Sequence, residues 1–182
     1  MKFTPKKVKL KNNKEVLVRS ATVSDAENIM NTIKTYISDS EYIPKMFEEF
    51  KMTLEQEINW IHSFTISENS LLLVAEYEGE IIGNIDINGN PRIIMYHTGM
   101  IGMGMLQEWR NAGLGTALME SAISWAKENP VLELLWLQVY TENQLGLYLY
   151  KKMGFEEIGI MKNFFKQNHK YYDSLTMSTS VK

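Results

Sequence analysis

Apolar side chains recur at helical spacing in the first third of the chain. A capping-box pattern at Ser24 precedes apolar residues that lie three or four positions apart as far as about Ser38. A second capping box at Thr53 opens another helical stripe, and short β-rich runs flank the pair Asn12-Asn13 near the start of the chain. This pattern predicts a hairpin followed by two helices.

The period of the apolar positions changes after residue 70. β-rich runs at 71–77 and 80–87 are separated by Glu78-Gly79, which is a hairpin signal, and a third run covers 97–106. Alternation along the second run places on one face Ile81, Gly83, Ile85 and Ile87, and on the other face Ile82, Asn84 and Asp86. We expect three neighbouring strands here.

The second half of the chain alternates helices with strands. A helix is expected from about Gly113 until just before Asn129-Pro130. The elements expected after it are a strand at 132–140, a short helix at 142–153, a strand at 154–160, a loop at 163–170 and a last strand at 171–178. This order predicts one α/β domain over residues 1–182, with a mixed sheet and helices on both faces.

Composition narrows the classes of protein to consider. The chain has no cysteine, which excludes disulfides, thiolate metal sites and a cysteine nucleophile, and suits a reducing cytoplasm. The longest apolar run, Leu71–Ala75, is far shorter than the roughly 20 residues of a membrane helix. Several lysines lie near the start, but no apolar segment of a secretory signal follows them. Because the net charge is −3, we interpret these lysines as a solvated edge, and expect no nucleic-acid or membrane partner.

A glycine-containing loop follows the run at 97–106. Arg110-Asn-Ala-Gly113-Leu-Gly115 stands directly before the apolar stripe of the next helix. Backbone N–H groups at such a helix start converge on an anion, the helix dipole adds roughly half a positive charge, and Arg110 can add a bidentate phosphate contact. The loop lacks the Lys-Ser/Thr of a P-loop, and Leu118 stands where a dinucleotide fingerprint has its third glycine. By itself, the pattern fits a helix that starts after a glycine turn equally well.

A second group of polar positions lies on the short helix at 142–153. Asn143, Gly146 and Tyr150 are spaced so that they share one helix face, whereas Leu145 and Leu149 lie on another face that should contact the core. An amide, a missing side chain and a phenol on one face suit a narrow cofactor channel. A helix cap, a surface glycine and a half-buried tyrosine are the alternative interpretation.

Together, the two patterns resemble the GCN5-related N-acetyltransferase (GNAT) superfamily. RxxGxG ahead of a helix, followed about 30 residues later by N-x-x-G-x-x-L-Y-x-x-x-G-F, carries the resemblance, which extends from Leu71 to Phe155. Asn90-Pro-Arg and then His97-Thr98 also resemble bacterial acetyltransferases of amino acids and related small amines. The resemblance implies a mostly antiparallel central sheet that is splayed at its middle.

The resemblance also implies roles for individual residues. The pyrophosphate of acetyl-CoA would bind backbone N–H groups of the loop, Thr116 would add a hydroxyl, and Asn143 would hydrogen-bond the pantetheine arm. The residues expected to contact the cofactor are Met103, Gly104, Met105, Arg110, Asn111, Ala112, Gly113, Leu114, Gly115, Thr116 and Asn143. The chain departs from the family pattern at Gln107 (often proline), Asn111 (often glycine) and Gly146 (often alanine), and the first two put the loop conformation in doubt.

Tyr150 is the residue that the resemblance assigns to general acid catalysis. A phenol, with a reference pKa of about 10, is protonated at neutral pH and can donate to the departing thiolate. The general base is open, and the candidates are His97, Asp86, Glu76 and Glu142. No metal and no covalent intermediate are needed.

The predicted function is therefore N-acetyl transfer from acetyl-CoA directly to a primary amine of a small acceptor, such as an amino acid or a polyamine-like compound. Acetylation of protein N-termini or lysines is one alternative. A CoA-binding sensor without catalysis is another, and it would need the loop 110–115 but not Tyr150. Dimers are common among proteins of this resemblance, so a homodimer is a further expectation.

Overall fold

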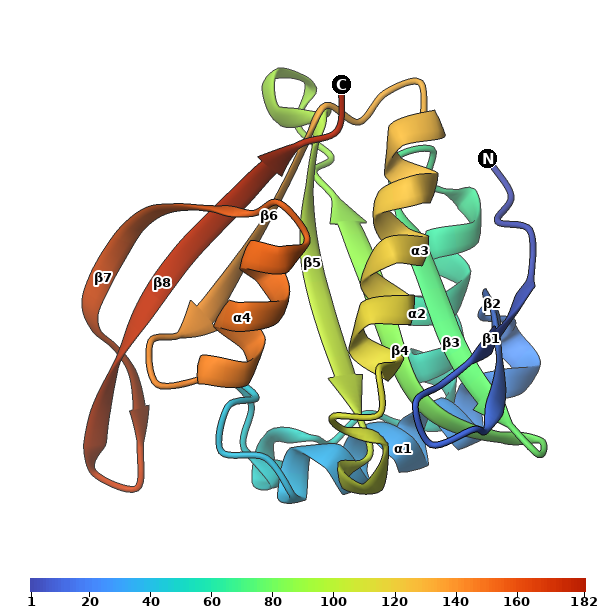
Figure 1. Cartoon of the computed structure of the whole chain (residues 1–182), viewed down its shortest axis with the longest axis horizontal. Coiled ribbons are helices and arrows are strands. Elements are labelled where there is room, and N and C mark those ends of the chain that lie inside the picture. Colours follow the sequence, from blue (N-terminus) through green and yellow to red (C-terminus); the bar gives the residue numbers. More distant parts are fainter.

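The computed structural model describes residues 1–182, which form an eight-stranded sheet with helices on both faces (Figure 1). The strands are β1 (Lys6–Lys9), β2 (Glu15–Ser20), β3 (Leu71–Tyr77), β4 (Glu80–Gly89), β5 (Thr98–Met105), β6 (Leu134–Tyr140), β7 (Glu156–Gln167) and β8 (Lys170–Ser180). The helices are α1 (Ala26–Ser38), α2 (Leu54–Ile66), α3 (Leu114–Glu128) and α4 (Gln144–Lys152). None of these helices is both long enough and apolar enough to cross a membrane.

The sheet is splayed at its centre. Its strand order is β1-β2-β3-β4-β5-β6-β8-β7, and every neighbouring pair is antiparallel except β5 and β6. The parallel pair is short, running only from Thr98 opposite Leu134 to Met100 opposite Trp136. Beyond these residues the two strands diverge (Figure 1), which confirms the predicted splay.

The splay leaves backbone groups of β5 unpaired. Leu106 donates its N–H to the carbonyl of Ile82 (3.0 Å), and the carbonyl of His97 accepts from Glu133 and Leu134 at the start of β6. In an antiparallel strand the N–H and C=O of one residue point to the same side, and this side alternates from one residue to the next. The backbone groups of the even-numbered residues of β5 therefore point toward β4. The polar groups of Met103 and Met105 therefore face the gap.

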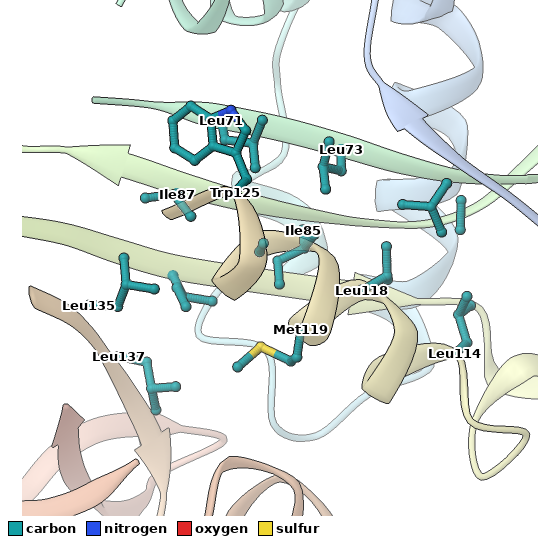
Figure 2. Packing of buried hydrophobic residues seen from close by; sticks show 14 of the residues in the cluster. Leu71, Leu73, Ile85, Ile87, Leu114, Leu118, Met119, Trp125, Leu135 and Leu137 are labelled. Atoms are coloured by element: carbon teal, nitrogen blue, oxygen red, sulfur yellow. The ribbon is translucent and has the colours of Figure 1, made fainter. Parts of the chain in front are cut away.

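The main hydrophobic core lies between the sheet and α3. Figure 2 shows Leu118 and Met119 on α3, which runs in front of the strands that carry Leu73, Ile85 and Leu135. All five side chains are fully buried. Such burial contributes about 1.5–3 kcal/mol for each large apolar side chain. A smaller apolar cluster on the opposite face joins α1 and α2 to β3. The core thus fixes α3, and with it the loop that precedes α3, against β5.

The two N-terminal helices form where the periodicity predicts them, but one cap differs. Thr53 caps α2 as expected, because its Oγ1 accepts from Gln56 N (3.2 Å) and Gln56 Oε1 accepts from Thr53 N (2.9 Å). The box before α1 starts at Thr22 rather than at Ser24, and its partner is Asp25. Asp25 is held there because its carboxylate also accepts hydrogen bonds from both terminal nitrogens of the Arg19 guanidinium, at 2.7 and 2.8 Å.

Two predictions for the strands were wrong, and irregular pairing explains both. A register shift opposite Ala75 and Glu76 places Ile81 in the α1/α2 cluster and Ile82 in the main core, so Ile81 does not share a face with Ile85. The predicted loop at 163–170 is mostly strand: β7 continues to Gln167, and its turn is Asn168-His169. The positive φ of Asn163 (55°), within an irregular stretch of the β7–β8 pairing, breaks the alternation there.

Candidate active site

A cavity of about 630 Å³ opens where β5 and β6 diverge. Its walls come from β5, from the loop before α3, from α4, and from the segment between α1 and α2. The predicted site residues that line it are Met103, Gly104, Met105, Arg110, Asn111, Gly113, Gly115, Thr116, Asn143 and Tyr150. Of the predicted set, only Ala112 and Leu114 are missing from the lining, because their side chains are buried.

The start of α3 presents free backbone donors to this cavity. Gly113 is the N-cap of α3 with φ of 96°, and no side chain caps the helix. The first-turn N–H groups of a helix have no intrahelical partner, so those of Leu114, Gly115 and Thr116 are available to an anion. Asn111 adopts φ of 61°, a conformation that asparagine tolerates better than most residues.

Gly115 allows the close packing of α3 beside the cavity. A Cβ at this position would lie 3.1 Å from Leu149 Cδ2 and 3.2 Å from Met105 Cε. A side chain at this position would therefore require the ends of the Leu149 and Met105 side chains to shift by a few tenths of an ångström.

Arg110 has a structural role in addition to the predicted one. Its Nη1 donates to the carbonyl of Asp39 (3.3 Å) and its Nη2 to the carbonyl of Met105 (3.4 Å). The guanidinium thus joins the end of α1 to the end of β5 while it lines the cavity. A contact with phosphate remains a prediction for this residue.

Lys11 lines the cavity and is absent from the predicted site. Its backbone N–H donates to the carbonyl of Ala112 (2.9 Å), and its Cγ lies 3.8 Å from where a Cβ of Gly113 would be. The lysines near the start of the chain are its only sequence signal, and the net charge of the chain favours a solvated edge for them. The contact joins residues about a hundred positions apart, so no local pattern predicts it.

Asn143 caps α4, as its position predicts. Its Oδ1 accepts from the N–H of Gly146 (3.0 Å), and a Cβ on Gly146 would lie 2.8 Å from its Nδ2. Gly146 therefore makes room first for this cap, and not only for a thin cofactor chain. The cap occupies the amide oxygen, and the amide nitrogen can donate to a ligand in the cavity.

Tyr150 lies on the same wall as Asn143 and Gly146, as predicted. Burial raises the pKa of Tyr150 to about 12, so the phenol stays protonated through the neutral range. Leu149 contacts the core as expected, but Leu145 was wrongly placed there, since it is 65% exposed. Leu147, by contrast, packs against the core.

The four candidate bases have different surroundings. Glu76 is paired with Arg19 (2.8 Å), His97 is exposed, and Glu142 is exposed at the cavity rim. Asp86 is buried on β4, where Asn88 Nδ2 donates to its carboxylate. Burial raises the pKa of Asp86 to about 7, so its carboxylate is the one whose proton affinity is tuned near neutrality.

Known proteins are similar to this chain in sequence. The model of the acetyltransferase (GNAT) family matches residues 32–155. An N-alpha-acetyltransferase from Sulfurisphaera tokodaii is 24% identical over 174 residues, which are 89% of this chain and 93% of that protein. The L-amino acid N-acetyltransferase AaaT from Escherichia coli is 29% identical over 106 residues, which are 58% of this chain and 65% of that protein.

Solved structures share the fold. An acetyltransferase of the GNAT family from Streptococcus pneumoniae superimposes with a TM-score of 0.88 at 26% identity, covering 91% of this chain and 99% of the other. YncA from Salmonella typhimurium, solved with its cofactor acetyl-CoA, has a TM-score of 0.82 at 15% identity, covering 92% and 94%. With the family match, these findings confirm the expected acyltransferase and its co-substrate, acetyl-CoA. The chain belongs to the acetyltransferase (GNAT) family.

Proposed function

We propose that the protein transfers the acetyl group of acetyl-CoA directly to the primary amine of a small acceptor of the amino-acid or polyamine-like kind, with Tyr150 as the general acid. One observation carries this proposal: the α3 N-terminus and the Asn143–Gly146–Tyr150 face of α4 line a single cavity in the gap of the sheet. Phosphate-binding groups and a proton donor thus lie along one slot.

The cofactor is expected to lie along the cavity from α3 to Tyr150. Its pyrophosphate would accept hydrogen bonds from the first turn of α3, with the charge of Lys11 nearby. The pantetheine arm would pair with backbone groups of Met103 and Met105 that face the gap, and would accept from Asn143 Nδ2. In this placement the thioester would lie beside α4.

The reaction then needs one attack and one proton delivery. The neutral amine nitrogen attacks the thioester carbonyl carbon, the C–N bond forms, the nitrogen loses one proton to solvent, the C–S bond breaks, and the Tyr150 hydroxyl protonates the departing sulfur. Solvent then reprotonates Tyr150. Burial raises the pKa of Tyr150 and also disfavours a charged thiolate in the cavity, so the phenol is protonated when the sulfur departs and the sulfur favours taking up that proton. Holding amine and thioester in place can lower the barrier by as much as ~7–11 kcal/mol.

Acetylation of the α-amine of a protein is the second candidate. The N-alpha-acetyltransferase from Sulfurisphaera tokodaii matches most of this chain, which favours it. Both candidates share the cofactor site and differ in the size of the molecule that carries the amine.

An amine panel separates the two functions. Release of free CoA thiol would be measured for amino acids, polyamines and short peptides that start with the same amino acids. A small-molecule enzyme turns over the free amines with the higher kcat/KM, whereas a protein N-acetyltransferase prefers the peptides. Tight acetyl-CoA binding without thiol release from any amine would contradict both and favour a sensor.

A further inference from the structure

The segment between α1 and α2, residues 39–53, forms one wall of the cavity. Its residues in the lining are Ser40, Tyr42 and Ile43, and each of these side chains is partly buried. The proposed cofactor position uses the start of α3, β5 and α4. The α1–α2 segment is therefore the wall that remains for the acceptor.

This segment contacts both sides of the gap in the sheet. At its start, the carbonyl of Asp39 accepts from Arg110 Nη1 in the loop that follows β5 (3.3 Å). Farther along, the ring of Tyr42 lies against the ring of Tyr140, the last residue of β6, with centroids 5.8 Å apart and planes inclined by 57°. Tyr42 thus stands at the cavity wall where the two halves of the sheet have diverged.

Two further rings hold Tyr140 in place. Phe165 of β7 is stacked on Tyr140 with centroids 4.1 Å apart, and Tyr172 of β8 meets it edge-on at 5.6 Å. Phe165 and Tyr172 are cross-strand partners, so they share one face of the sheet. Stacked and edge-on aromatic rings attract one another. None of the three rings lines the cavity, so they support Tyr42 from behind.

Ile43 is held on the other side of the segment. It packs against a small buried cluster made by Tyr36 and Ile37 of α1 and by Phe50. The wall is therefore attached to β6 through Tyr42 and to α1 through Ile43. Side chains that are fixed in this way can discriminate between ligands by shape.

The chemistry of the wall decides which group fits against it. The α1–α2 segment presents a hydroxyl, a phenol ring and a branched alkyl chain to the cavity, whereas the charged residues of the lining lie elsewhere: Lys11, Arg110, Glu142 and Lys152. An ammonium group buried against this wall would lose water without gaining a carboxylate, which is costly. An apolar or aromatic group gains free energy when it leaves water. The wall therefore favours a large apolar group over the distal charge of a polyamine.

We propose that Tyr42 and Ile43 determine the acceptor specificity of this enzyme: they select amines that carry a large apolar or aromatic group beside the reacting nitrogen. The inference rests on the proposed acetyl transfer and narrows its acceptor to the amino-acid kind. Phe165 is a positioning residue, because it holds Tyr140 and, through Tyr140, the ring of Tyr42. The wall acts on the choice of amine and leaves proton delivery by Tyr150 unchanged.

The test compares phenylalanine with alanine as acceptors, because both carry the same α-amine and they differ only in the ring. An apolar pocket discriminates a single methylene group by about 10–200-fold, so kcat/KM of the wild type should be at least about 10-fold higher for phenylalanine. Spermidine should be the poorest acceptor. If only peptides are acetylated, peptides that start with these two amino acids take the place of the free compounds.

Variants of the wall should change this preference. Tyr42→Ala should bring the ratio of the two kcat/KM values close to one, mainly by raising the KM for phenylalanine. Tyr42→Phe keeps the ring and should keep the ratio, and Phe165→Ala should lower the ratio less than Tyr42→Ala does. Phe47→Ala is the matched control, because Phe47 is an exposed ring of the same segment and does not line the cavity. Calorimetry should show the same acetyl-CoA affinity in all four variants.

Three results would overturn the inference. They are equal kcat/KM values for phenylalanine and alanine in the wild type, a wild-type preference for spermidine, and an equal loss with both amino acids in Tyr42→Ala, which indicates a structural role. Each of these results leaves the acetyl transfer itself standing. The transfer fails only if the wild type releases no CoA with any amine, which would overturn both.

Discussion

At the scale of single residues, the loop before α3 depends on backbone conformations that few side chains adopt. Gly113 has φ of 96° and Asn111 has φ of 61°, and between them they turn the chain from β5 into α3. This turn aims the free N–H groups of α3 at the cavity. Glycine and asparagine are the residues that adopt such angles at the lowest cost.

Gly113→Ala should lower both stability and cofactor affinity. A Cβ at φ of 96° is strained, which costs on the order of 1–3 kcal/mol, and relief of the strain would turn the N–H groups away from the phosphates. Gly79→Ala is the matched control, because Gly79 has φ of 86° in the open β3–β4 turn. Urea unfolding should show similar losses for the two variants, and calorimetry should show weaker acetyl-CoA binding for Gly113→Ala alone. Equal affinities would contradict the role of the turn.

At the scale of elements, the site joins segments from both ends of the chain. The β1–β2 turn touches the loop before α3 through Lys11 and Ala112, and Arg110 ties that loop to the end of α1. Contacts outside the two motifs therefore hold the cavity walls in place. Residues that line the cavity can lie in segments that carry no motif.

Lys11→Ala should raise the KM for acetyl-CoA modestly. An exposed charge beside a phosphate contributes about 0.2–1 kcal/mol, which corresponds to at most about a fivefold change, and salt should diminish it. Lys9→Ala removes an exposed lysine of the same hairpin that does not line the cavity, and should leave the KM unchanged. Steady-state kinetics at low and high salt would measure both. Identical effects of the two variants would show that only overall charge matters.

The sequence predicted most of the helices and strands, and it predicted residues that line one cavity, because both depend on local patterns. Helical stripes located α1 to α4, and the Asn143–Gly146–Tyr150 spacing placed three residues on one wall of the cavity. The features that the sequence did not predict depend on irregular strand pairing or on contacts between segments that are distant in the sequence. The irregular pairing near Asn163 hid the end of β7, and the Lys11 contact joins distant segments. Burial of Glu57 likewise depends on how α2 docks.

At the scale of the whole molecule, buried carboxyls make stability depend on pH. Burial raises the pKa of Asp86 and of Glu57 to about 7, so the folded state binds more protons than the unfolded state between about pH 4 and 7. Stability must then fall as pH rises through that window. Asp25 has the opposite effect on the pH dependence of stability. Burial raises its pKa, but hydrogen bonds from Arg19 and Thr22 hold the pKa below the ordinary value, so the stability that Asp25 contributes is lost in acid.

Chemical unfolding between pH 5.5 and 8 tests this balance. The free energy of unfolding should decrease with rising pH, by at most ~1.4 kcal/mol per pH unit for each carboxyl. Asp86→Asn and Glu57→Gln should each flatten the slope, whereas Glu120→Gln should preserve it. A slope that is unchanged in both variants would show that these carboxyls do not titrate as inferred.

The central claim is that the phenol of Tyr150 delivers the proton to the leaving thiolate. Its most direct test is the turnover of Tyr150→Phe with acetyl-CoA saturating, measured by thiol release with the best amine of the panel. We predict that kcat falls by about 10²–10⁴-fold while calorimetry shows unchanged acetyl-CoA affinity, and that Tyr171→Phe, an exposed control on β8, behaves as the wild type. Wild-type kcat in Tyr150→Phe would contradict the claim.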